Sequence, residues 1–205
     1  MKLLVSTFLF CMLWSCAPFG LGGYQAEISK FQTQLNKEYL DTATTPLRGE
    51  NLKKFRRHPF FAVDKKFRVT AKLERAADPV IFDLPTSSGK SKQYKEYGTA
   101  SFQIDGKNYQ LKLYQSLDLM MRPEYQDYLF LPFRDETNGK TTYGGGKYLD
   151  LRIPSSDKII IDFNKSYHPF CAYNAYDYNC PIVPEENILP VAIEAGVMYD
   201  DVYYD

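Results

Sequence analysis

The side chains best suited to chemistry lie in two dense segments, residues 132–151 and 162–193. In the first segment, Arg134 and Asp135 directly follow an apolar run, so both stand where a strand is expected to end. A guanidinium at a strand end can bind a carboxylate or a phosphate through two parallel hydrogen bonds. The alternative is an ion pair between Arg134 and an acidic side chain that fixes the loop. We predict one ligand-binding pocket lined by four residues: Arg134, Asp135, Tyr143 and Asn164.

Three aspartates, Asp135, Asp150 and Asp162, stand at or near the ends of expected strands. If they converged, two could act as acid and base in sugar chemistry, or three could hold a calcium ion. We favour the plainer interpretation, in which they cap turns. The glycines at 144–146 run into an expected strand rather than a helix, which favours a turn or bulge over a phosphate-binding loop. We therefore expect neither a metal nor a cofactor.

Two of the four cysteines fall within the first sixteen residues, so Cys171 and Cys180 remain. In an exported protein such an even remainder indicates a disulfide, and closing this short loop would stabilise the fold by about 2.5–3 kcal/mol. The alternatives are free thiols, or a metal site that adds His58 and His168, the only two histidines. A free Cys171 thiol could also act as a nucleophile with His168 as its base.

One helix is expected before the strands that position these side chains. From residue 24 to residue 39, apolar side chains recur at steps of three or four and charges fall off this stripe. The stripe consists of Tyr24, Ile28, Phe31, Leu35 and Tyr39. This pattern predicts an amphipathic helix that ends near Thr42. Residues 41–55 are polar and contain Pro46 and Gly49, so we expect a loop there.

From Phe67 onward, apolar and polar side chains alternate as they do in strands with one buried face. Asp105-Gly106 stands between two such runs and predicts a tight hairpin. The expected strands are 67–73, 80–84, 100–104, 109–114, 128–133, 147–153 and 158–163, with 191–193 as a candidate last strand. Strands joined by short turns predict a mainly β fold, an antiparallel sandwich or barrel, with an N-terminal amphipathic helix.

The first sixteen residues predict export and lipid attachment. Lys2 precedes a short apolar run, residues 3–13, which is typical of a secretory signal and shorter than the roughly 20 residues that span a bilayer. The run ends in Leu-Trp-Ser-Cys, which resembles the lipobox at which a bacterial peptidase cuts before a lipid-bearing cysteine, here Cys16. The alternatives are ordinary signal cleavage near Ala17 and a buried first helix.

Composition and charge limit the domain count and the class of partner. Removal of residues 1–15 takes Lys2 from the 25 basic side chains and leaves 24 against 25 acidic ones. Such a chain lacks the positive field that binds nucleic acid, so we expect no nucleic-acid partner. The expected organisation is a lipoprotein signal peptide at 1–15, a tether at 16–23, a single β-rich domain with its N-terminal helix at 24–198, and an acidic tail at 199–205.

Together the two dense segments, PFRDETNGKTTYGGGKYLDL and DFNKSYHPFCAYNAYDYNCPIVPEENILPVAI, resemble the bacterial domain-of-unknown-function family 1684 (DUF1684). The matching positions are Pro132–Asp135, Thr137, Gly139, Thr142–Gly144, Gly146, Tyr148–Leu151, Asp162–Asn164, Tyr167, Pro169, Cys171–Asn174, Cys180, Pro181, Glu186 and Asn187. Two departures are Lys147, where the family pattern has Arg, and His168 and Phe170, where it has Asn and Tyr. With its lipobox, the chain is identified as a lipoprotein member of a family that has no assigned function.

We expect an exported protein anchored to the bacterial membrane by lipid at Cys16, on the periplasmic side or the cell surface. No complete catalytic constellation is present, so the leading hypothesis is a non-enzymatic module that binds a small molecule or an envelope component. Arg134 would be its polar anchor and tyrosines its apolar wall. The alternatives are a structural or assembly lipoprotein, and a hydrolase that uses the aspartates or the His168 and Cys171 pair.

Overall fold

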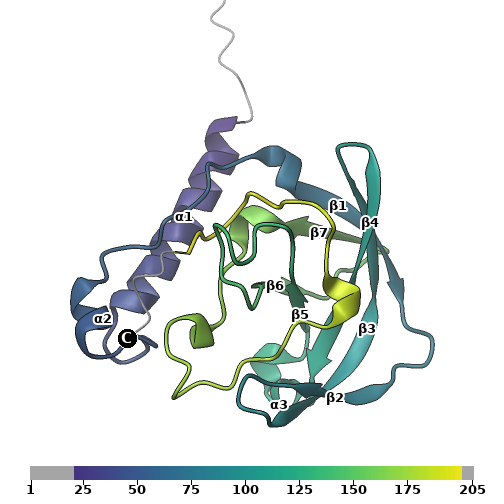
Figure 1. The fold of residues 1–205 in the computed structure, drawn as a ribbon. Helices are drawn as coiled ribbons and strands as arrows, with labels where there is room; N and C mark the ends of the chain where they lie inside the picture. Colours follow the sequence, from purple (N-terminus) through teal and green to yellow (C-terminus); the bar gives the residue numbers. More distant parts are fainter. Residues whose placement is uncertain (1–20, 200–205) are drawn as a thin grey trace, which may run out of the picture.

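The computed structural model describes residues 21–199 (Figure 1). The expected signal peptide, Cys16 and the last six residues lie outside this range. Over the described residues, no helix is long and apolar enough to cross a membrane.

A long helix, α1 (Leu21–Leu40), precedes the sheet and lies alongside it (Figure 1). Its predicted apolar stripe faces the domain, since Ile28, Leu35 and Tyr39 are buried. The helix begins three residues earlier than expected, so residues 21–23, which we placed in the tether, are helical.

The β domain is one seven-stranded sheet in which every pairing is antiparallel. Its strands are β1 (Arg68–Arg75), β2 (Ile81–Pro85), β3 (Ser91–Ile104), β4 (Lys107–Ser116), β5 (Tyr128–Phe133), β6 (Lys147–Arg152) and β7 (Lys158–Asp162). The order is β6-β5-β4-β3-β1-β7, and β2 pairs with β3 beside this path. The sheet curls into a half-barrel (Figure 1), which confirms the mainly antiparallel β fold with an N-terminal helix.

The turn between β3 and β4 is formed by the predicted Asp-Gly pair. Asp105 and Gly106 have φ angles of 50° and 75°, the left-handed conformation that a two-residue hairpin turn of this type requires. Glycine adopts that conformation without a steric cost, and aspartate tolerates it better than most residues. The local sequence therefore fixes the register of the long hairpin.

Alternating side chains fill the inside of the half-barrel. On β5, Leu129, Leu131 and Phe133 have no exposed surface and pack in the main core. Residues 191–193 also lie against this core but form no strand, contrary to the sequence prediction. The reason is that Ile193 N–H donates to the Asp135 carboxylate at 3.2 Å, a side-chain partner rather than a neighbouring strand.

The expected loop 41–55 contains a short helix, α2 (Gly49–Lys54), that its polar composition concealed. A second small core joins this region to α1 and to the C-terminal loops through Tyr39, Leu47, Phe55 and Tyr173. One further helical turn, α3 (Leu117–Met120), follows β4. Short 3-10 turns occur at Lys65–Phe67, Pro123–Tyr125, Phe163–Lys165, Phe170–Ala172 and Glu185–Asn187.

Candidate functional site

Asp135, one of the four predicted ligand-binding residues, is committed to internal contacts. Its carboxylate lies 3.0 Å from Lys147 Nζ and accepts hydrogen bonds from the backbone N–H groups of Thr137 (2.8 Å) and Ile193 (3.2 Å). Burial lowers the pKa of Lys147, and the Asp135 carboxylate opposes that shift. This aspartate therefore organises the loop after β5.

Arg134 lies on the surface, where its guanidinium forms no hydrogen bond or ion pair with any residue in 21–199. The ion pair that was the alternative for this arginine is therefore not present in the described part of the chain. Its backbone is fixed instead, because Arg134 N–H donates to Asn187 O at 3.0 Å and Leu189 N–H donates to Arg134 O at 2.8 Å.

Tyr143 and Asn164 serve two different parts of the structure. The Tyr143 ring packs edge-on against Tyr199, with ring centres 5.5 Å apart, and the turn after it leads into β6. The Asn164 amide donates to Asp64 O at 2.8 Å and to the Tyr24 hydroxyl at 2.9 Å, which ties the start of α1 to the sheet.

The four residues predicted to line one pocket do not meet at any of five cavities in the described part of the chain. These cavities have volumes of about 300–840 Å³, and none of the four predicted residues lines any of them. A ligand contact by Arg134 stays a prediction.

The three aspartates divide between two places. Asp150 and Asp162 line one cavity of about 350 Å³ beside α1, whereas Asp135 is buried with Lys147. Within this cavity, Asp162 is held by Arg68 at 2.8 Å and Asp150 by two tyrosine hydroxyls. Over residues 21–199 no group of three histidine, cysteine or acidic side chains could hold a metal ion.

Cys171 and Cys180 are paired as predicted: their sulfur atoms lie 2.10 Å apart, at disulfide distance. Ser87 supports the pair from the turn after β2. Its hydroxyl lies 3.2 Å from Cys171 Sγ and accepts a hydrogen bond from Cys180 N–H at 3.2 Å. Because a disulfide sulfur has no proton to donate, the Ser87 hydroxyl is the donor to Cys171 Sγ. In this state Cys171 has no thiolate to offer as a nucleophile.

Both histidines contact the hydroxyl of Tyr173. His168 Nδ1 lies 3.2 Å and His58 Nδ1 lies 3.3 Å from this oxygen, and Tyr143 N–H donates to His168 Nε2 at 3.3 Å. Since His168 Nε2 accepts, its Nδ1 carries the proton of the neutral ring and donates to the Tyr173 hydroxyl. Burial lowers the pKa of His58 to about 3 and lowers that of His168 as well, so both rings are neutral at pH 7.

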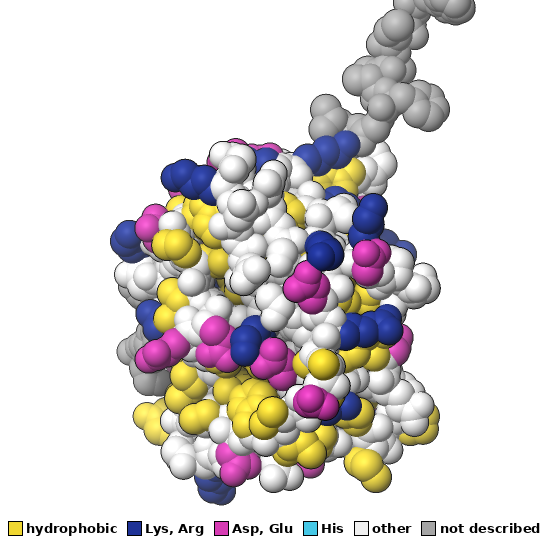
Figure 2. Space-filling model, turned by 90° about the vertical axis from the view of Figure 1, so that its right-hand side faces the viewer, with side chains coloured by type: hydrophobic (Ala, Val, Ile, Leu, Met, Phe, Trp, Pro, Cys, Tyr) yellow, Lys and Arg dark blue, Asp and Glu magenta, His cyan; other side chains and the backbone are white. Residues whose placement is uncertain are grey.

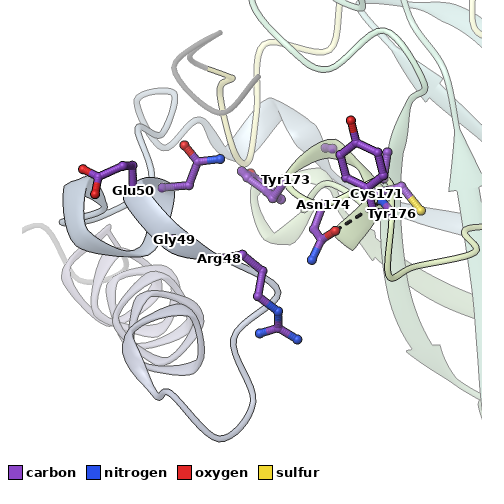
Figure 3. A pocket seen from close by; sticks show the side chains of 10 residues that line it. Arg48, Gly49, Glu50, Cys171, Tyr173, Asn174 and Tyr176 are labelled. Carbon is purple, nitrogen blue, oxygen red and sulfur yellow. Dashed lines mark hydrogen bonds between the residues drawn. The ribbon is translucent and has the colours of Figure 1, made fainter. Parts of the chain in front are cut away.

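An apolar cavity lies where residues 48–51 meet residues 171–176, and we call it the disulfide-loop pocket (Figure 3). Its volume is about 670 Å³, and apolar surface dominates its lining. Tyr173 is buried at its base, whereas the Tyr176 side chain at its edge is 95% exposed. Figure 3 shows Arg48 and Asn174 extending from the two segments toward the same space.

Polar contacts hold the two sides of the disulfide-loop pocket together. The Asn174 amide donates to Pro46 O at 3.0 Å and to the Asp177 carboxylate at 2.8 Å. Arg48 Nε lies 3.2 Å from Asp177 Oδ2, and more than half of each of these two side chains is exposed. A surface ion pair of this kind contributes little to stability, so the guanidinium can exchange its partner for a ligand anion.

Sequence reasoning pointed to one side of this pocket and missed the other. The Cys171–Cys180 disulfide on one side of the pocket was expected from the cysteine count. Arg48 carried no signal, because it lies in a polar stretch and its partner Asp177 is 129 residues away. A contact at that separation follows only from the tertiary fold.

The exposed face in Figure 2 mixes basic and acidic side chains over its upper and middle parts, and hydrophobic side chains gather toward its lower end. The larger hollow on the outer face of β1, β3 and β4, about 840 Å³, is lined mainly by lysines and polar side chains. Arg68 and Lys72 within it already pair with Asp162 and Glu74. It is therefore a weaker candidate than the disulfide-loop pocket.

Comparison with known proteins gives a family but no activity. A family model described as "Protein of unknown function (DUF1684)" matches residues 53–198. The solution NMR structure of an uncharacterized protein from Haloarcula marismortui is 30% identical, with a TM-score of 0.68, and the match covers 88% of this chain and 97% of that chain. No curated protein matches the sequence. The similarity therefore extends to an archaeal protein.

Proposed function

The chain belongs to the DUF1684 family, and from that premise we propose that it is a non-enzymatic binding module. Its ligand is a small amphiphilic molecule with an apolar body and one anionic group. The site is the disulfide-loop pocket, with Arg48 as the polar anchor and Tyr173 and Tyr176 as the apolar wall. An arginine anchor with a tyrosine wall was also expected from the sequence, but the arginine proposed here is Arg48 and not Arg134.

The observation that carries this proposal is an apolar cavity of ligand size with an exposed arginine at its edge. The volume of about 670 Å³ lies inside the range of small-molecule sites, about 300–1,000 Å³. An apolar wall with a few polar groups is the usual composition of such sites. The Tyr176 ring, which is almost fully exposed, gains the most contact if a ligand covers it.

A second part of the proposal is the location. We propose that the protein is exported and anchored by lipid at Cys16 to a bacterial membrane, so that the pocket samples molecules of the cell envelope. The paired Cys171 and Cys180 support this, because disulfides persist mainly in oxidising compartments. The denatured mass of protein purified from its own membrane should fit residues 16–205 plus acyl chains, less the two thiol hydrogens. A mass of the full chain without lipid would overturn the anchor.

Binding can be tested with anilinonaphthalene sulfonate, a probe that joins an apolar ring system to one anion. We expect saturable binding to the mature wild-type chain and a dissociation constant about tenfold weaker for Arg48→Gln. Tyr176→Ala should weaken binding by a similar factor, because the exposed ring contributes contact area and no core packing. Circular dichroism should show that both variants keep the native fold.

The matched controls are Arg122→Gln and Met121→Ala, which remove an exposed arginine and an exposed apolar side chain outside the pocket. Both should bind the probe like the wild type. If all four variants bind equally, the disulfide-loop pocket is not the site. If the wild type binds no probe and no fatty acid, the alternative of a structural or assembly lipoprotein replaces the binding module.

A further inference from the structure

A second cavity, separate from the disulfide-loop pocket, lies between α1 and the edge strand β6. We call it the helix groove; its volume is about 300 Å³. It is lined by Phe31, Gln34, Leu35, Glu38, Asp150, Tyr167 and Phe170. This set combines three aromatic rings with two carboxylates, and it contains no lysine, arginine or histidine. Such a lining disfavours anions and is suited to a cation.

The Asp150 carboxylate is held in place through one of its two oxygens. Its Oδ1 accepts hydrogen bonds from the Tyr128 hydroxyl at 2.6 Å and the Tyr167 hydroxyl at 2.7 Å. Burial raises the pKa of both phenols above their usual range, so each keeps its proton and donates. Its other oxygen, Oδ2, accepts no hydrogen bond from residues 21–199. The two tyrosines thus orient the carboxylate and leave one oxygen free.

Glu38 has no cationic partner within the described chain either; its carboxylate accepts only from the Gln34 amide, at 3.1 Å. The neighbouring cations, Arg68 and Lys165, line an adjoining cavity that shares Phe31, Asp150 and Tyr167 with the groove, and both cations are already paired. Arg68 Nη1 lies 2.8 Å from Asp162 Oδ2, and Lys165 Nζ lies 2.6 Å from Glu27 Oε1. Neither cation therefore neutralises the two groove carboxylates, and the groove keeps a negative charge.

We propose that the helix groove binds a compact organic ammonium group, a primary amine or a quaternary ammonium. Aromatic faces attract such cations through the ring quadrupole, and a neighbouring carboxylate adds direct charge attraction. Phe31, Tyr167 and Phe170 supply the rings, whereas Asp150 and Glu38 supply the charge. The volume suits an ammonium head with a short chain, at the small end of ligand sites.

The test is a calorimetric titration of the full mature chain with choline, a soluble quaternary ammonium. Its matched control ligand is 3,3-dimethyl-1-butanol, which has the same shape without the charge. We expect choline to bind about tenfold more tightly than the alcohol, because only the cation gains from the rings and carboxylates. Equal affinities for the two molecules would overturn the proposal.

Variants that remove one carboxylate charge test whether choline binds in the helix groove. Asp150→Asn keeps the shape and the hydrogen bonds from both tyrosines but removes the charge, and it should weaken choline binding about tenfold. Glu38→Gln lies on the exposed face of α1, so its expected loss of affinity involves no loss of folding. Asp78→Asn, an exposed acid in the turn between β1 and β2, is the control and should bind like the wild type. Wild-type affinity in both groove variants would overturn the assignment.

The ammonium group can come from a lipid headgroup or from a free amine. Vesicles of phosphatidylcholine that displace choline, when phosphatidylglycerol vesicles do not, would support the lipid headgroup. Displacement by neither vesicle, with choline binding intact, would support a free amine. Binding of anilinonaphthalene sulfonate at the other pocket should be unchanged in Asp150→Asn, so either proposal can fail without the other.

Discussion

Lys147 Nζ lies 3.0 Å from Asp135 Oδ2 in the interior of the domain, and neither side chain has any exposed surface. Removing one partner leaves the other charge buried and unpaired, which costs far more than the pair itself contributes. We expect Lys147→Met to lower the free energy of unfolding by about 3–5 kcal/mol. Urea denaturation at pH 7 measures this change.

Two comparisons separate this effect from a general loss of charge. Glu74→Gln breaks the exposed Lys72–Glu74 pair, whose atoms are only 2.6 Å apart, and should leave the urea midpoint unchanged. The double variant Lys147→Met/Asp135→Asn should recover much of the lost stability, because no unpaired charge remains in the interior and the side-chain oxygen at position 135 can still accept from Thr137 and Ile193 N–H. If Lys147→Met unfolds at the wild-type urea concentration, the buried pair has no structural role.

The two histidines predict a pH dependence with a definite sign. Burial lowers the pKa of His58 to about 3 and lowers that of His168 in the folded state, whereas both titrate near their usual pKa when unfolded. The unfolded chain therefore binds more protons below about pH 6.5, and stability falls as the pH falls from there. Each histidine should contribute a slope of about 1.4 kcal/mol per pH unit.

Urea unfolding between pH 5 and pH 8 tests this slope. His58→Phe should reduce the slope by about one proton, because the remaining contribution comes from His168. Its ring would lie in an aromatic cluster, since His58 already packs 4.2 Å from the Tyr39 ring and 5.0 Å from the Phe55 ring. An unchanged slope in this variant would mean that His58 is protonated in the folded state.

The sequence predicted the parts of the fold that depend on local pattern. The apolar stripe from Tyr24 to Tyr39 predicted α1, and the Asp105-Gly106 pair predicted the hairpin, because helix periodicity and turn conformation are set by neighbouring residues. The apolar run at 128–133 also predicted β5 at its observed bounds. The helix α2 was missed, since its few polar residues carry no periodic pattern.

The candidate sites could not be predicted in the same way, because they are formed by contacts between residues far apart in the sequence. Arg134 looked like a ligand anchor because it follows a strand, but its side chain lies on the surface and lines neither the disulfide-loop pocket nor the helix groove. Asp150 was noticed as a strand-end acid. Its place in the helix groove, however, depends on Tyr167, which donates a hydrogen bond to it, and on Phe31 of α1, which lines the same cavity. These residues come together only because α1 packs beside the sheet, next to the edge strand β6.

The Cys171–Cys180 pair makes stability depend on redox state. Replacing both cysteines by alanine should lower the free energy of unfolding by about 2.5–3 kcal/mol, the chain-entropy value for so short a loop. Because Cys171 also lines the disulfide-loop pocket, probe binding should weaken in the same variant. A thiol reductant should reproduce both effects in the wild type and change nothing in the double variant. Equal stability of the wild type with and without reductant would contradict this prediction.

Gly146 occupies a position that only glycine fills without strain. Its φ angle is 105°, and a Cβ there would lie 2.7 Å from Phe133 O and 2.7 Å from Val183 Cγ2. Gly146→Ala should therefore lower the free energy of unfolding by about 1–3 kcal/mol, from backbone strain and overpacking together. Gly144→Ala is the matched control two residues away, because a Cβ there meets only Gly139 Cα, at 4.0 Å. Its effect should stay within about 0.5 kcal/mol. Equal losses in the two variants would mean that the turn relaxes around an added methyl group, and that close packing of this turn against β5 is not required.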